Sequence, residues 1–264
     1  MALIHMFHHS DVLGRGVGCY VILPQKATRQ IGMESAEKER IPVLWLLHGA
    51  SDDHTIWQRR TSIERYVAPL GMAVVMPDVE ISGYANQAHG GRFYDYISKE
   101  LPAVLYNYYG LSDRREDNYI CGLSMGGDGS LKIGLANPEN YSVIGCLSAG
   151  IFNPVIPDDT QNIDPKTNWG LFKRVHGKDT TDSEERITES AEKIIREGKP
   201  VPRVFLSIGH DDFCMGAAQF TKEFFEKFEG NPFDFRYEEH DGAHTWEYWD
   251  EHIQRFLQYV EGKL

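Results

Sequence analysis

Short continuous apolar runs alternate along the chain with longer stretches whose apolar residues recur at helical spacing. A continuous apolar run of four to eight residues is typical of a strand that is buried on both faces of a sheet. The sequence contains several such runs, and 233–238 instead alternates between apolar and polar residues. We therefore predict strands at 16–23, 42–47, 72–76, 118–122, 141–147, 202–208 and 233–238.

Helical periodicity fills most of the intervals between these runs. Pro102 falls inside one periodic stretch, so we expect a kink or break there. Strands that alternate with helices indicate an α/β protein with a mostly parallel sheet covered by helices on both faces. The predicted helices are 56–70, 93–109, 127–137, 190–196, 217–228 and 245–260.

The pattern dissolves between 152 and 189 into Asp, Asn, Thr, Pro and Lys. A long stretch of this kind in a compact domain is usually an insertion or a lid over a functional face. With 264 residues in total, the chain suits a single domain, 1–264, with a lid-like insertion at about 152–189.

Composition narrows the classes of partner. The formal net charge is -12, and nucleic-acid binding needs clustered Lys and Arg, so we expect no nucleic-acid partner. No stretch approaches the roughly 18 apolar residues that span a bilayer, and residues 1–10 do not resemble a secretory signal.

The four cysteines are widely spaced without a CxxC motif. This predicts free thiols in a reducing cytoplasm and no zinc site.

Gly122-Leu-Ser-Met-Gly126 stands between a predicted strand and a predicted helix. Strand, G-x-S-x-G and helix in this order form the context of a nucleophile elbow, in which a serine is exposed at a sharp turn. The glycines allow the strand and the helix to approach closely. Ser124 is therefore the candidate nucleophile, and a glycine-rich turn with an incidental serine is the alternative.

A serine hydroxyl needs a base to accept its proton and a carboxylate to orient that base. On this type of sheet the two should follow in the order Ser, Asp, His. Two downstream loops offer such a pair at strand ends: 209–212, with Asp211 and Asp212, and 241–244, with His244. This agreement is more specific than the pentapeptide alone.

An oxyanion hole needs two preorganised N–H donors. One would be the backbone N–H of Met125, and the second should come from the loop after an early strand. His48-Gly49-Ala50 occupies that position, and we nominate the Ala50 N–H. His48 is expected to order this loop by hydrogen bonding. Gly49 and Trp57 complete the candidate substrate-binding residues, although the main expectation for Trp57 is a place in the core.

Four motifs together resemble the putative-esterase family of α/β hydrolases, which includes esterase D (S-formylglutathione hydrolase) and bacterial tributyrin esterases. The resemblance extends from the first strand to the last helix and is greatest to small tributyrin esterases. The motifs are His48-Gly-Ala-Ser-Asp-Asp-His-Thr-Ile-Trp57, Gly122-Leu-Ser-Met-Gly-Gly127, Gly209-His-Asp-Asp-Phe213 and Gly242-Ala-His-Thr-Trp-Glu-Tyr-Trp249.

The resemblance implies an α/β-hydrolase fold and selects Asp212 over Asp211 and His244 over His240. It also implies activity on short acyl esters, no metal or organic cofactor, and in many members a homo-oligomer. Related sequences often continue the acid motif with Leu-Tyr, where this chain has Cys214-Met215. This departure leaves open which acyl or leaving group the pocket near Asp212 accepts.

The resulting hypothesis is a cytoplasmic serine carboxylesterase that cleaves a small-molecule ester. The alternatives are a thioesterase of the S-formylglutathione hydrolase kind, a carbohydrate acetyl or feruloyl esterase, an acyltransferase, and a non-catalytic binding protein on the same scaffold. Among residues without an assigned role, Ser148 is expected to be a wall residue. His5, His8 and His9 are expected on a solvated arm or edge strand.

Overall fold

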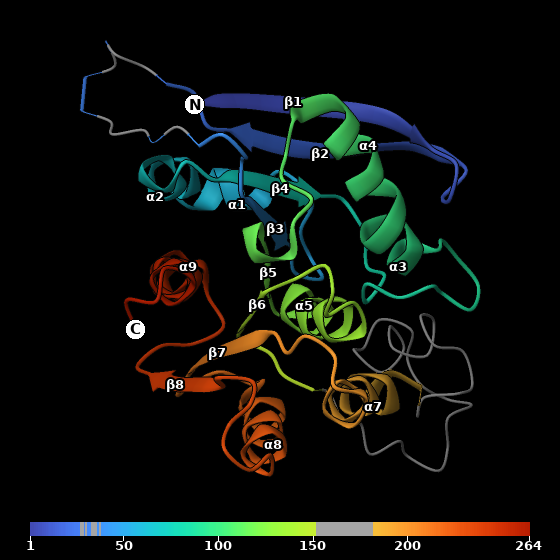
Figure 1. The fold of residues 1–264 in the computed structure, drawn as a ribbon, viewed down its shortest axis with the longest axis vertical. Coiled ribbons are helices and arrows are strands. Elements are labelled where there is room, and N and C mark those ends of the chain that lie inside the picture. Colours follow the sequence, from blue (N-terminus) through green and yellow to red (C-terminus); the bar gives the residue numbers. More distant parts are fainter. Residues whose placement is uncertain (27–28, 30, 33–35, 37, 152–181) are drawn as a thin grey trace.

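The computed structural model describes residues 1–26, 29, 31, 32, 36, 38–151 and 182–264, with side chains for all of these except 182–185. The described chain forms an eight-stranded sheet of order β1-β2-β4-β3-β5-β6-β7-β8 (Figure 1). β1 and β2 pair antiparallel, as do β2 and β4, and all other neighbours are parallel. The strands are β1 (Ala2–Ser10), β2 (Arg15–Leu23), β3 (Val43–Leu47), β4 (Ala73–Pro77), β5 (Asn118–Leu123), β6 (Val143–Leu147), β7 (Arg203–Gly209) and β8 (Arg236–His240).

Helices cover both faces of the sheet. In Figure 1, α2 and α9 lie on one side, and α3, α4, α5, α7 and α8 lie on the other. The α-helices are α1 (Ile56–Arg60), α2 (Ile63–Val67), α3 (Phe93–Asp95), α4 (Leu101–Tyr109), α5 (Met125–Ala136), α7 (Asp182–Glu197), α8 (Met215–Glu226) and α9 (Trp246–Val260). Together with the strand order, this arrangement confirms the predicted α/β-hydrolase fold.

β3 shows why the sheet has two cores. All five of its residues are buried, and successive side chains of a strand point to opposite faces. Val43, Trp45 and Leu47 belong to the core under α3–α5, α7 and α8. Leu44 and Leu46 belong to the core under α1, α2 and α9. The continuous apolar run thus reflects burial on both faces, as predicted.

Several boundaries differ from the expectations. The helix predicted at 56–70 is divided into α1, α2 and a 3₁₀-helical turn, Ala68–Leu70. The helix predicted at 93–109 is divided by a π-helical turn, Tyr96–Glu100, because Pro102 at the start of α4 has no N–H to continue the α-helical pattern. α7 begins at Asp182, so the irregular stretch ends earlier than 189. The rest of the proposed lid, 152–181, lies outside the described residues.

Another difference is at β8, which begins at Arg236 and not at 233. Asn231 and Asp234 both have positive φ, 46° and 44°, so the chain turns where an alternating pattern had predicted a strand. Phe233 is buried by this turn with 1% of its surface exposed. Its apolar character therefore reflects core packing and not strand alternation.

The predictions for the N-terminal histidines and for the cysteines agree with the structure. β1, which carries His5, His8 and His9, is an edge strand of the sheet. All four cysteines are free thiols. Among the helices that the structure describes, none has the length and apolar character needed to cross a membrane.

Candidate active site

Ser124 occupies the turn between β5 and α5 in a strained backbone conformation. Its φ is 51° and its ψ is -122°, a region that a non-glycine residue occupies only when its surroundings enforce it. A Cβ on Gly122 would lie 2.4 Å from the Gly126 carbonyl oxygen, and one on Gly126 would lie 2.5 Å from that of Leu47. Only glycine therefore fits at either position, and the two glycines let strand and helix close tightly around Ser124.

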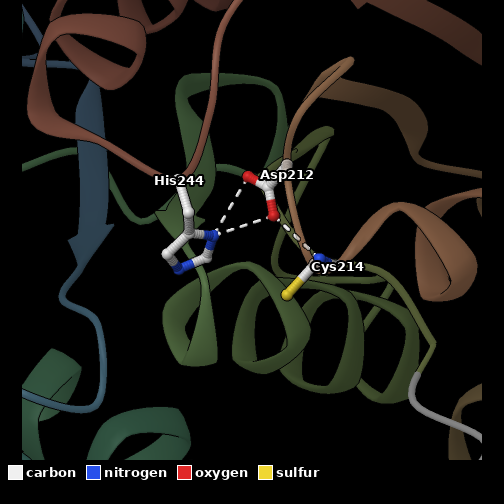
Figure 2. A group of neighbouring side chains, drawn as sticks. All are labelled: Asp212, Cys214 and His244. Carbon is white, nitrogen blue, oxygen red and sulfur yellow. Dashed lines mark hydrogen bonds and ion pairs between the residues drawn. The ribbon is translucent and has the colours of Figure 1, made fainter.

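A hydrogen-bonded chain links Ser124 to two distant loops. His244 Nε2 lies 3.0 Å from Ser124 Oγ, and His244 Nδ1 lies 3.0 Å from each carboxylate oxygen of Asp212. His244 comes from the loop between β8 and α9, and Asp212 from the loop after β7, as Figure 2 shows. Since an ionised carboxylate only accepts hydrogen bonds, Nδ1 carries the proton and Nε2 is free to accept one from the serine.

The environment of Asp212 keeps it ionised. Burial alone would raise the pKa of this carboxyl, but hydrogen bonds from His244, the Cys214 backbone N–H and the Ser148 hydroxyl lower the pKa below its ordinary value. The Cys214 bond is 2.8 Å long. The neighbouring Asp211 is exposed. The structure thus brings Asp212, and not Asp211, into contact with His244.

Ser148 contributes a hydrogen bond to Asp212 that the sequence did not predict. It is fully buried with a φ of 51°, and Trp249 Nε1 donates to its hydroxyl oxygen over 2.8 Å. Because that oxygen already accepts from the indole, its own proton is available for Asp212. From the sequence we expected Ser148 only to line the wall of the site. Its hydroxyl reaches the Asp212 carboxylate because the chain bends directly after β6, which the sequence pattern does not indicate.

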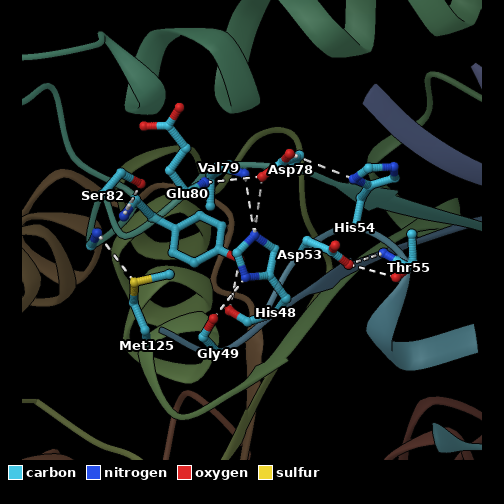
Figure 3. Close-up of polar contacts among 12 residues, drawn as sticks. His48, Gly49, Asp53, His54, Thr55, Asp78, Val79, Glu80, Ser82 and Met125 are labelled. Carbon is cyan, nitrogen blue, oxygen red and sulfur yellow. Dashed lines mark hydrogen bonds and ion pairs between the residues drawn. The ribbon is translucent and has the colours of Figure 1, made fainter. Parts of the chain in front are cut away.

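His48, the first residue after β3, is buried and makes two hydrogen bonds to the backbone (Figure 3). Nδ1 donates to the Gly49 carbonyl over 2.7 Å, and Nε2 accepts from the Val79 N–H over 3.2 Å. Burial lowers the pKa of His48, a shift only partly offset by the Gly49 hydrogen bond and the charge of Asp78. The neutral ring therefore forms no true ion pair with Asp78, whose Oδ1 lies 3.9 Å away.

These bonds orient the peptide between Gly49 and Ala50. In a trans peptide the C=O and the following N–H point in opposite directions, so fixing the Gly49 carbonyl also fixes the Ala50 N–H. The Asp52 N–H bonds the same carbonyl at 3.2 Å. A Cβ on Gly49 would lie 3.6 Å from Ser124 Cβ, which places this loop beside the serine.

Met125 supplies the other candidate donor. It is the first residue of α5, and the N–H groups of the first helical turn have no partner within the helix. The helix dipole adds a partial positive charge at this end. The Met125 N–H therefore remains a candidate donor to an oxyanion formed next to Ser124.

Two aromatic residues differ in their relation to this site. Trp57 is buried with 1% exposed, and its indole donates to the Leu47 carbonyl over 2.9 Å. It therefore lies in the core beneath the site, as mainly expected for this residue, and offers little surface to a substrate. Phe213 has 72% of its surface exposed, and its ring centroid lies 4.2 Å from that of His244. Phe213 thus presents an apolar surface beside the candidate base.

Two groups of side chains could hold a metal ion among the residues that the structure describes. One consists of Asp212, Cys214 and His244, and the other of Glu238, His240 and His252. His240, the competing candidate base, lies in the second group, where its Nε2 is 3.3 Å from Glu238 Oε2.

Comparison with known proteins extends these observations to the whole chain. The family described as Putative esterase matches residues 10–259. An acetyl esterase from Caldicellulosiruptor saccharolyticus is 26% identical over 98% of each chain. The Staphylococcus aureus fluorophosphonate-binding serine hydrolase FphF is 28% identical, with a TM-score of 0.80 over 98% of each chain. The S-formylglutathione hydrolase FrmB of the same organism is 30% identical, with a TM-score of 0.74 over 98% of this chain and 96% of that one.

Proposed function

This chain belongs to the putative-esterase family and is an ester hydrolase, and we propose that it cleaves short-chain carboxylic esters through an acyl-enzyme on Ser124. The observation that carries the proposal is the continuous chain from Ser124 Oγ through His244 to Asp212, with 3.0 Å at each step. Nucleophile and base within hydrogen-bond reach, with the base oriented by a third group, are the signature of covalent catalysis.

In the first half-reaction, Ser124 Oγ attacks the ester carbonyl carbon and its proton passes to His244 Nε2. The Asp212 carboxylate, already hydrogen-bonded to Nδ1, stabilises the imidazolium that forms. The Ala50 and Met125 N–H groups stabilise the negative charge on the carbonyl oxygen, an effect worth about 10²–10³ in rate for each donor.

Collapse of this intermediate transfers the Nε2 proton to the leaving alkoxide and releases the alcohol. Water then attacks the acyl-enzyme, gives its proton to the same nitrogen, and Ser124 leaves with that proton. Each half-reaction returns His244 to the neutral tautomer that the hydrogen bonds define. No step calls for a metal or organic cofactor.

The comparisons support a short acyl group, since one relative along the full chain is named an acetyl esterase. A second candidate substrate is a thioester of the S-formylglutathione kind, because FrmB is 30% identical to this chain. The same residues would serve both, as a thiolate is a better leaving group than an alkoxide.

A substrate panel tests the proposal. We expect kcat/KM for p-nitrophenyl acetate and butyrate to exceed that for the octanoate by at least about tenfold, a normal range for discrimination by an apolar pocket. S-formylglutathione and an acetylated sugar belong in the same panel. Preference for S-formylglutathione would support the thioesterase, and a rate highest on octanoate would contradict the short-chain proposal.

A further inference from the structure

Three metal-ligating side chains of different chemistry meet in the candidate active site, two of them already part of the Ser124–His244–Asp212 chain. The Asp212 carboxylate, the Cys214 thiol and a ring nitrogen of His244 place their ligand atoms within 4.8 Å of one another. Figure 2 shows the three side chains converging from two loops. We propose that a thiophilic divalent cation such as Zn²⁺ or Cd²⁺ binds Asp212, Cys214 and His244, and that its binding inhibits the esterase.

The distance between Asp212 and His244 is close to that of a tetrahedral site, and the three ligand atoms lie within 4.8 Å of one another. Zinc bonds of about 2.0–2.3 Å at tetrahedral angles separate neighbouring ligand atoms by roughly 3.3–3.6 Å. Asp212 and His244 Nδ1 are already 3.0 Å apart, so a cation can replace the proton between them with small movements. Thiolate, imidazole and carboxylate are the three ligand types that zinc uses in proteins.

Cys214 is positioned to join these two ligands. Its backbone N–H bonds Asp212 Oδ1, which fixes the residue next to the carboxylate at the start of α8. The side chain is half-buried and so remains reachable for a small ion. Burial and the charge of Asp212 raise the pKa of this thiol to about 12, so the metal-free site holds a protonated thiol.

Binding moves two protons in a defined way. The Cys214 thiol loses its proton to solvent, as coordinating thiols do, and its sulfur donates an electron pair to the cation. When His244 Nδ1 binds the cation, the proton of this neutral ring shifts to Nε2. Nε2 then no longer accepts the proton of Ser124, and the nucleophile loses its base. The two anionic ligands neutralise the charge of the cation.

The second group of ligating side chains is less favourable for a cation. Glu238 is hydrogen-bonded by Arg255 at 2.6 and 2.9 Å and by Arg236 at 2.7 Å, so two guanidinium charges oppose an incoming cation. His252 Nδ1 is already 2.8 Å from the Ser207 hydroxyl. A variant of this group, His240→Asn, is therefore a matched control.

The inhibitory part of this inference rests on the proposed function, but binding itself does not, so the experiment has two arms. In the first, p-nitrophenyl acetate hydrolysis is measured against ZnCl₂ for the wild type, Cys214→Ser and His240→Asn, each relative to its own zinc-free rate. We expect Cys214→Ser to raise the half-inhibiting zinc concentration at least about tenfold, the lower range for disturbing a metal site. His240→Asn should leave it unchanged.

In the second arm, CdCl₂ is added to the wild type, Ser124→Ala and Cys214→Ser, and thiolate-to-metal charge-transfer absorption is recorded. The band should appear in the wild type and in Ser124→Ala, and be absent from Cys214→Ser. Equal zinc sensitivity of Cys214→Ser and the wild type would overturn the inhibitory site. A cadmium band that persists in Cys214→Ser, or is absent from the wild type, would overturn binding at Cys214. The cadmium arm gives its answer even if the protein has no esterase activity.

Discussion

Two histidine–carboxylate pairs follow strands of the same parallel sheet, His244 with Asp212 and His48 with Asp78. His244 has 16% of its side chain exposed and contacts a hydroxyl through Nε2 and a carboxylate through Nδ1. The His48 side chain is 1% exposed, and its two nitrogens are bonded to the backbone of Gly49 and Val79.

The difference shows what makes a histidine a candidate base in this fold. Proximity of a carboxylate is common to both pairs, but only His244 has an Nε2 that faces a hydroxyl. His48 instead uses its ring to hold the loop that carries the Ala50 N–H, the proposed oxyanion donor. The two pairs are therefore expected to respond differently to substitution.

Of the substitutions considered at His244, Asp212, His48 and Ser148, removal of the His244 ring should have the largest effect on kcat. His244→Ala leaves Ser124 without a proton acceptor, and we expect kcat for p-nitrophenyl acetate to fall by about 10⁶, as in a serine protease that lost its base. Circular dichroism would verify that the variant is folded. A loss below tenfold in a folded variant would remove His244 from the mechanism.

Asp212→Asn should have the second-largest effect, a loss of about 10⁴ in kcat, because an amide no longer selects the Nδ1–H tautomer of His244. Asp211→Asn is the matched control, since its side chain is exposed on the same loop and should leave kcat near that of the wild type. The reverse ranking in steady-state kinetics would reassign the acid to Asp211.

Substitution of His48 should cost less and in a different way. His48→Ala frees the Gly49 carbonyl, and a misaligned Ala50 N–H should lower kcat by about 10²–10³, the contribution of one oxyanion donor. His48→Asn keeps an N–H donor near the position of Nδ1 and should recover part of this loss. The pH profile should keep its shape; a displaced acid limb would mean that His48 itself exchanges the proton.

Ser148→Ala should have the smallest effect, about three- to tenfold on kcat, since the hydroxyl acts on the reaction only through Asp212 and a typical hydrogen bond contributes about 1 kcal/mol. Loss of this bond raises the pKa of Asp212 and strengthens its hold on the proton shared with His244. The acid limb of the kcat/KM profile should therefore move to higher pH. Ser130→Ala, which removes a buried hydroxyl that donates to the Gly126 carbonyl, should leave the profile in place.

Much of the fold could be predicted because local pattern and tertiary role coincide. The strand predicted at 42–47 is β3, and the turn at Ser124 carries glycines that the packing demands. β8 was misplaced because Phe233 and Tyr237 alternate with polar residues whether the chain extends or turns at Asp234.

The site could be predicted only where a side chain follows a motif. Ser124, Asp212 and His244 follow strands in the expected order, and the structure brings them together. Ser148 and Cys214 reach Asp212 through a bend and a helix start that no spacing rule encodes. A rule based on cysteine spacing could not find the Asp212, Cys214 and His244 group, because its ligands come from two loops about 30 residues apart.

The most direct test of Ser124 as the nucleophile is covalent labelling with a fluorophosphonate probe, followed by mass spectrometry of the labelled peptide. We predict one adduct on Ser124, no adduct in Ser124→Ala, and strongly slowed labelling in His244→Ala. Labelling at another residue, or normal ester hydrolysis by Ser124→Ala, would contradict this role of Ser124.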